Sequence, residues 1–154
     1  MGALLAGCQK PVTISAPSLP GAAQPKLSTI KLWIGAEELV TEMALNGPQQ
    51  QTGMMFRTNV AENEAMIFVM PFPHRASFWM KNTSVPLSVA YIDPRGVILE
   101  IHDLQPHNTN SVVAASDNVQ YALETSQGWF ERHKIQPGTL IRTEAGSLQQ
   151  TFRK

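Results

Sequence analysis

The sequence has little charge and a single cysteine. Charged residues make up 16% of the 154 positions, below the share of about 25% that is usual for globular domains. Twelve Lys and Arg balance twelve Asp and Glu, so the chain lacks the basic surface that nucleic-acid binding requires, and no nucleic-acid partner is expected. One cysteine excludes an internal disulfide. The sequence holds no run of 18 apolar residues, which excludes a membrane-spanning helix.

The first eight residues end in a pattern that is typical of bacterial lipoproteins. Leu5-Ala6-Gly7-Cys8 resembles the lipobox, in which small residues precede a cysteine whose thiol receives a diacylglyceryl group. Stable anchoring needs about two acyl chains, and a modified Cys8 would carry them. Only seven uncharged residues precede Cys8, so residues 1–8 are interpreted as a truncated signal remnant. The alternative is a free cysteine in a tail.

The next segment has the composition of a tether. Residues 9–28 contain four prolines among Ala, Ser, Gly and Gln, which predicts a disordered spacer. An anchored domain would then face the periplasm from the cell envelope. Gln9 stands where an aspartate is associated with inner-membrane retention, which favours the outer membrane.

Residues 29–152 are predicted to form one mainly β domain. Apolar residues make up 43% of the chain, enough for a core. Short strand-like segments alternate with Gly and Pro turns, which favours a single β-sandwich or barrel-like domain. The predicted strands are 29–34, 38–45, 65–70, 75–81, 87–93, 97–104, 119–125, 139–143 and 147–152, and two short helices are expected near 46–53 and 127–133.

Several short motifs follow one another in an order that points to a known family. They are Gly53-Met54-Met55-Phe56-Arg57, Met66-Ile67-Phe68, Phe78-Trp79-Met80-Lys81-Asn82-Thr83, Pro86-Leu87 and Leu123-Glu124, with Asp93, Gly96, Gly128 and Gly138. Over residues 30–143 the chain resembles the bacterial and archaeal family known as domain of unknown function 192. The resemblance implies a β-rich, sandwich-like fold and supplies no reaction. The family usually has Asp after the Pro-Leu pair, where this chain has Ser88.

The block from Trp79 to Thr83 is the densest group of polar and aromatic residues. Trp79 offers a stacking surface, Lys81 a cation, and Asn82 and Thr83 hydrogen-bonding groups, so the block could form the wall of a ligand pocket. The alternative is that Trp79 packs into a core and that Asn82-Thr83 bonds a loop backbone.

Two further charged residues are candidates for the same surface. Arg57 could clamp a carboxylate through two hydrogen bonds, or it could form an internal salt bridge with Glu124 or Asp93. Glu124 follows Leu123 in an apolar strand, where burial could raise its pKa and suit it to acid–base work. The alternative for Glu124 is an arginine pair or a contact with backbone amides.

These residues lead to three functional interpretations. The first is a non-enzymatic ligand-binding or accessory module that uses Arg57, Trp79, Lys81, Asn82, Thr83 and Glu124, with a small molecule or cell-wall fragment as ligand. The second is a periplasmic hydrolase that combines Glu124 with Asp93 or His102. The third is a copper-handling protein that uses methionines and histidines. The first interpretation involves no cofactor and no metal.

Overall fold

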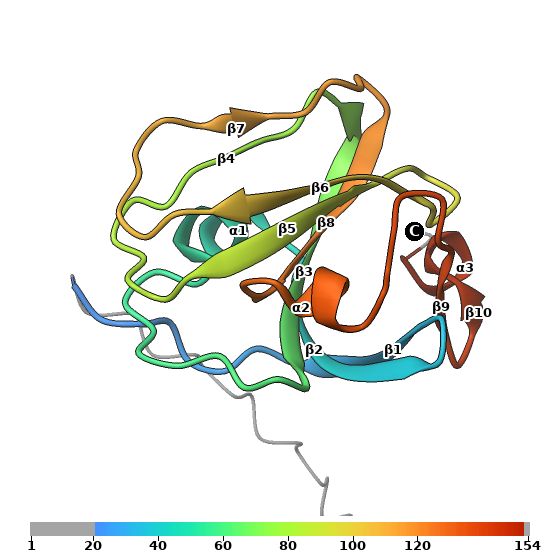
Figure 1. Ribbon diagram of the computed structural model, residues 1–154, viewed down its shortest axis with the longest axis horizontal. Helices are drawn as coiled ribbons and strands as arrows, with labels where there is room; N and C mark the ends of the chain where they lie inside the picture. Colours follow the sequence, from blue (N-terminus) through green and yellow to red (C-terminus); the bar gives the residue numbers. More distant parts are fainter. Residues whose placement is uncertain (1–20, 153–154) are drawn as a thin grey trace, which may run out of the picture.

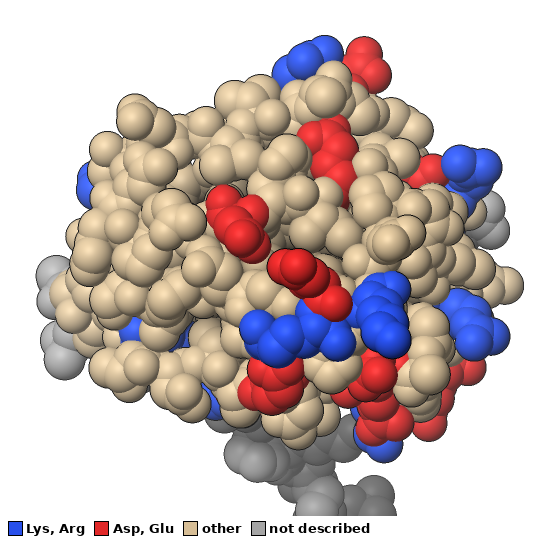
Figure 2. Space-filling view, in the orientation of Figure 1, with Lys and Arg blue, Asp and Glu red and all other residues tan. Residues whose placement is uncertain are grey.

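Ten strands and three short helices make up residues 21–152, the part of the chain that the computed structural model describes (Figure 1). In chain order they are β1 (Thr29–Ile34), β2 (Glu37–Ala44), α1 (Gly47–Thr52), β3 (Glu64–His74), β4 (Ser77–Phe78), β5 (Leu87–Ile92), β6 (Ile98–Leu104), β7 (Val112–Val113), β8 (Val119–Ser126), α2 (Trp129–Arg132), β9 (Ile141–Thr143), β10 (Gly146–Ser147) and α3 (Leu148–Phe152). Among these residues, no helix combines the length and the apolar composition needed to cross a membrane. On the face drawn in Figure 2, basic and acidic side chains lie side by side in the lower half of the view.

Eight strands form one sheet that closes between the segments leading into β6 and β9. The order is β10-β9-β1-β2-β3-β8-β5-β6, and all neighbours are antiparallel except β2 and β3. Val97, which precedes β6, forms a β-bridge with Leu140, which precedes β9. Ile141 N also donates to Gly96 O at 2.9 Å. The sheet is therefore closed into a barrel, which confirms the mainly β, sandwich or barrel-like fold expected from the sequence.

The inside of the barrel is filled by one apolar core. Seven of the eight strands, all except β10, contribute to it, and α2 adds Trp129 and Phe130, whose rings meet edge to face with centroids 5.3 Å apart. The wall side chains in this core include Leu32, Ile34, Leu39, Ala65, Ile67, Ala90, Ile92, Ile98, Leu123 and Ile141. Burial of apolar side chains from seven strands in one core accounts for the closure of the sheet.

A second apolar core lies on the outer face of the central strands. Side chains alternate between the two faces of a strand, so Met66 and Phe68 of β3 face outward where Ala65 and Ile67 face inward. Phe78 and Val112 of the two-stranded sheet β4-β7 pack on this outer face. Helix α1 is held to β3 by Gln50, whose side chain donates to Val69 O at 2.8 Å, and both elements are seen beside the sheet in Figure 1. Strands β3, β5 and β8 are thus covered on both faces, which explains their nearly continuous apolar sequences.

Part of the predicted tether contacts the domain. Residues 21–28 were expected to belong to the disordered tether, but they lie along the domain. Leu27 N donates to Glu42 Oε2 at 2.8 Å, and the Gln24 side chain donates to two backbone carbonyls at the end of α1. The preceding residues, with Cys8 and the rest of the predicted anchor and tether, lie outside the described residues.

Two predicted strands differ from the structure. Residues 147–152 form α3 after a two-residue strand, because Ser147 and Gln150 make a reciprocal helix cap. Gln150 N donates to Ser147 Oγ at 3.1 Å, and Ser147 N donates to Gln150 Oε1 at 2.8 Å. Of the predicted strand 75–81, only Ser77–Phe78 pairs, and its partner is β7.

Candidate functional site

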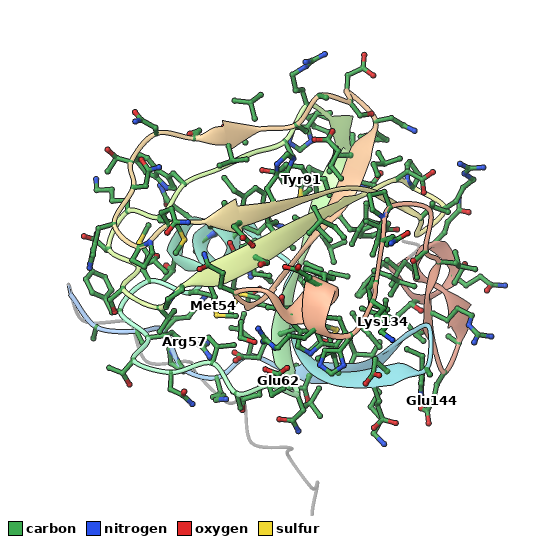
Figure 3. All side chains as sticks on the ribbon, viewed as in Figure 1. Met54, Arg57, Glu62, Tyr91, Lys134 and Glu144 are labelled. Atoms are coloured by element: carbon green, nitrogen blue, oxygen red, sulfur yellow. The ribbon has the colours of Figure 1, made fainter. Side chains whose placement is uncertain are left out.

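A cavity of about 330 Å³ lies between the outer face of the sheet and the segments that cover it. Its volume is at the lower end of the range of about 300–1,000 Å³ that is typical of small-molecule sites. Figure 3 shows one lining residue, Met54, over the left-hand end of β5. The sheet strands β3, β5 and β8 contribute Phe68, Met70, His74, Leu87 and Glu124, and the covering segments contribute Gln50, Gln51, Thr52, Gly53, Met54, Met55, Ser77, Phe78, Trp79 and Thr83.

A second, wider hollow of about 780 Å³ lies between β3, β8 and α3. None of its described lining residues is Asp, Glu, His, Lys or Arg. Amides such as Gln50, Gln120 and Gln149 supply most of its polar groups. The smaller cavity is therefore the better candidate for chemistry, because its lining includes the ionisable groups of Glu124 and His74.

Glu124 is the ionisable group that sets the character of the smaller cavity. Strand β8 places it between Met66 of β3 and Val89 of β5, so both of its neighbours across the sheet are apolar. The residue is 4% exposed, and among the described residues its Oε2 atom has no hydrogen-bond partner. Burial raises the pKa of Glu124 to about 8, so at neutral pH the protonated acid predominates. An unpartnered buried carboxyl is costly and is available to a ligand.

The wall formed by α1 depends on a glycine. Asn46 caps the helix, which the sequence predicted near 46–53, by accepting a hydrogen bond from Gln49 N at 3.0 Å. The helix ends at Gly53, where φ is 48°. A Cβ atom there would lie 3.2 Å from the Phe68 ring. Gly53 therefore allows the backbone to turn with positive φ while it contacts a cavity-lining ring.

The block from Trp79 to Thr83 is divided between the cavity and the surface. Trp79 and Thr83 line the cavity. Trp79 is 46% exposed, so it stands at the mouth and is not packed into a core. Lys81 lies outside, with Nζ 5.3 Å from the centroid of the Trp79 ring. Asn82, which has a φ of 55°, contributes its backbone oxygen to Phe56 N at 2.8 Å and does not line the cavity.

Arg57 forms a buried salt bridge, but with a partner that the sequence did not suggest. Its guanidinium donates to both carboxylate oxygens of Glu42, at 2.5 and 2.8 Å. The expected pairing with Glu124 or Asp93 is wrong, because the loop that carries Arg57 reaches the sheet over β2 instead of β8. Arg57 is thus occupied inside the domain and does not line the cavity.

The three side chains of the predicted hydrolase site do not converge. Asp93 organises a turn by accepting hydrogen bonds from the backbone N of Arg95 and Val97. It lies four residues along β5 from the partner of Glu124, a separation of about 13 Å. His102 contacts Glu100 at 2.8 Å and is two strands away from Glu124, about 10 Å.

Part of the cavity lining was not predicted from the sequence, in which the methionines and His74 were considered as functional residues only for copper binding. Met54, Met55 and Met70 all face the cavity, with His74 beside them. His74 Nδ1 is 3.1 Å from a backbone oxygen, which leaves Nε2 available. Within residues 21–152, no group of three or more His, Cys, Asp or Glu could hold a metal ion. The doublet Met54-Met55 after a helix-ending glycine was the signal that could have indicated a cavity wall.

Comparisons with known proteins give a family and two structural neighbours. The family model DUF192, described as uncharacterized ACR, matches residues 30–143. None of the curated proteins compared with the chain matches it. One similar crystal structure is from Sinorhizobium meliloti 1021 and is described as "a putative transcription regulator"; its identity is 25%, its TM-score is 0.74, and the match covers 78% of this chain and 97% of that one. Another, a protein of unknown function from Novosphingobium aromaticivorans DSM 12444, has 25% identity and a TM-score of 0.70, with 82% and 99% covered.

Proposed function

This chain belongs to the DUF192 family, and we propose from the geometry of its cavity that its domain is a small-molecule-binding module whose ligand contacts Glu124. The observation that carries this proposal is the carboxyl of Glu124: the residue lines the cavity, and its buried Oε2 atom has no hydrogen-bond partner among the described residues. Buried polar groups in folded proteins are nearly always hydrogen-bonded. A ligand that bonds this carboxyl would remove the cost of leaving it unpaired.

The mouth of the cavity supports the same proposal. Trp79 is nearly half exposed and lines the entrance, so one face of its indole ring is available to a ligand. Exposed aromatic rings beside a polar group are typical of binding sites. Thr83 adds a hydroxyl to the lining, although that hydroxyl already donates to Lys81 O at 3.1 Å.

A screen of small fragments by NMR would test binding in this cavity. With methyl-labelled methionine, we expect bound fragments to shift the methyl signals of Met54, Met55 and Met70, which line the cavity. The methyl of Met43 is the internal control, because Met43 packs against the core inside the barrel. If no fragment at millimolar concentration moves the cavity methyls more than that of Met43, the proposed function is wrong.

The domain is further proposed to work from a membrane, anchored through lipid on Cys8 in the cell envelope. The twelve residues 9–20 could span at most about 40 Å when extended, which would keep the cavity close to a bilayer. Mass spectrometry of the mature protein, expressed from its full precursor, tests this. An unmodified Cys8 in the mature chain would contradict the anchor.

Handling of Cu(I) is a second candidate function, and one observation favours it. Three thioethers, from Met54, Met55 and Met70, share the cavity with His74, and Met and His suit Cu(I). Anaerobic competition with a colorimetric Cu(I) chelator would show one copper per chain, and Met54→Leu would weaken binding at least tenfold. An affinity that Met54→Leu leaves unchanged would reject this candidate.

A further inference from the structure

The lining of the cavity carries an acid and no fixed positive charge. Glu124 is its one carboxyl, and none of the lining residues is Lys or Arg. The closest candidates for a cation are engaged elsewhere: Arg57 is paired with Glu42, and Lys81 lies outside over the Trp79 ring. A phosphate, sulfate or carboxylate would therefore enter the cavity with no partner for its charge, which is unfavourable in a buried site.

The walls around Glu124 are apolar and aromatic. Phe68 and Phe78 meet edge to face with ring centroids 4.9 Å apart, and Trp79 lies beyond them at the mouth. Met54 and Met70 add thioethers, and both are buried. Aromatic faces attract cations, whereas hydrated Ca²⁺ and Mg²⁺ require several oxygen ligands. The surroundings thus suit a cation that carries a hydrocarbon body.

We propose that the ligand is a small organic ammonium ion, with its N–H groups on the Glu124 carboxylate and its hydrocarbon part against Phe68 and Met54. This inference rests on the proposed function, because it names the ligand class of the same cavity. Once Glu124 is ionised, its Oε2 atom has neither a hydrogen-bond donor nor a compensating charge among the described residues, and an ammonium supplies both. A neutral hydroxyl would supply only the donor.

Binding of an ammonium ion at this site should release a proton. In the free protein, burial keeps the carboxyl protonated at neutral pH, so the bound cation replaces that proton, which leaves for solvent. Affinity should then rise with pH, by about tenfold between pH 6 and pH 7. The other titratable groups that face Glu124 are Tyr91 of β5 and His74 across the cavity, and α1 and β4 contribute none.

A matched pair of probes tests the proposal by calorimetry. The 2-phenylethylammonium ion is the charged probe, and 2-phenylethanol is its neutral counterpart of nearly the same shape. With the wild-type protein we expect the ammonium to bind more tightly, with release of close to one proton at pH 6.5 measured in buffers of different ionisation enthalpy. We expect the alcohol to show no pH dependence over this range.

Variants identify the group that is responsible. Glu124→Gln keeps the shape of the side chain and removes its charge, so it should lower ammonium affinity at least tenfold at pH 7.5. Glu144→Gln, at an exposed position, should leave that affinity unchanged. If Glu124→Gln does not fold, the number of protons that the wild-type protein releases on binding the ammonium ion still tests the proposal.

The failures of the two proposals are distinguishable. Equal affinity for the ammonium and the alcohol, or ammonium binding without proton release, overturns the ligand class while binding in the cavity stands. If neutral fragments move the methyl signals of Met54 and Met70 and the ammonium ion does not, the ligand class is again wrong. If neither probe nor any fragment moves those methyl signals, both proposals fall.

Discussion

Glu42 and Glu124 face the same side of the sheet on opposite sides of Met66, yet only Glu42 has a cationic partner. Met66 pairs with Glu42 across β2 and β3 and with Glu124 across β3 and β8, so the backbones of the two glutamates are two strand spacings, about 10 Å, apart. Burial acts to raise the pKa of Glu42, but the hydrogen bond from Arg57, the Leu27 N–H and the guanidinium charge together lower it. Burial of Glu124 is uncompensated, and its pKa rises.

The raised pKa of Glu124 predicts that the protein loses stability as the pH rises. Between the unfolded value of 4.5 and the folded value of about 8, the folded state holds a proton that the unfolded state has lost, so the free energy of unfolding falls with pH. Since one pKa unit corresponds to about 1.4 kcal/mol, the free energy of unfolding of the wild type should fall by several kcal/mol as the pH rises through this range. Glu124→Gln should not show this fall. Urea unfolding at pH 5, 6.5 and 8 measures this, with Glu144→Gln as the control. Parallel pH profiles for the wild type and Glu124→Gln would contradict the assignment.

The Arg57–Glu42 pair predicts that the free energy of unfolding falls as the pH is lowered, the opposite of the effect of Glu124. It also predicts a large loss of stability when the pair is broken. Glu42 has a lowered pKa, so its stabilising contribution is present above pH 4.5 and is lost as the pH falls through the folded value. Arg57→Ala leaves a buried carboxylate unpaired and should cost about 3–5 kcal/mol. Lys31→Ala, which breaks the exposed pair with Glu38, should cost under about 1 kcal/mol. Denaturant unfolding at pH 7 compares them, and equal losses would show that the Glu42 pair has no special role.

The two glycines at the ends of α1 form a matched test of the cavity wall. Gly53→Ala places a Cβ atom at a positive φ and 3.2 Å from the Phe68 ring, so it should destabilise the fold by about 1–3 kcal/mol. Gly47→Ala meets no atom within 4 Å and should be neutral or stabilising by up to about 1 kcal/mol. Thermal unfolding of both variants checks the difference. A Gly53→Ala protein as stable as Gly47→Ala would show that this turn is not constrained.

Replacing Gln24 should loosen the end of α1 without affecting the rest of the domain. Its Nε2 donates to Gln49 O at 3.1 Å and to Gly53 O at 2.9 Å, so it satisfies two carbonyls at the end of α1. Gln24→Ala should speed hydrogen exchange of the Gly53 amide, which donates to Gln49 O at 2.9 Å, by about three- to tenfold, the equivalent of one hydrogen bond. Amides of β8 should keep their protection. Gln105→Ala, at an exposed position, is the control, and uniform acceleration across β8 would indicate global destabilisation instead.

Elements set by neighbouring residues could be predicted from the sequence. The alternation in β1 and β2, the Asn46 cap of α1 and the turn after β5 depend on side chains within a few positions of one another. The error at 147–152 was also local, because the Ser147–Gln150 cap signal was present and was overlooked. The cavity was only partly visible, since Trp79, Thr83 and Glu124 were among the candidates and Met54, Phe68 and His74 were not.

By itself, the sequence determined that this chain forms a β-rich domain of the DUF192 family and that Glu124 lies in an apolar strand. Only the tertiary structure decided that Arg57 pairs with Glu42 and leaves Glu124 without a partner. The physical reason is that an ion pair depends on which strands are neighbours and on where a distant loop crosses them. The order β2-β3-β8, the parallel pairing of β2 with β3 and the closure of the barrel are non-local properties, and no pattern of nearby residues records them.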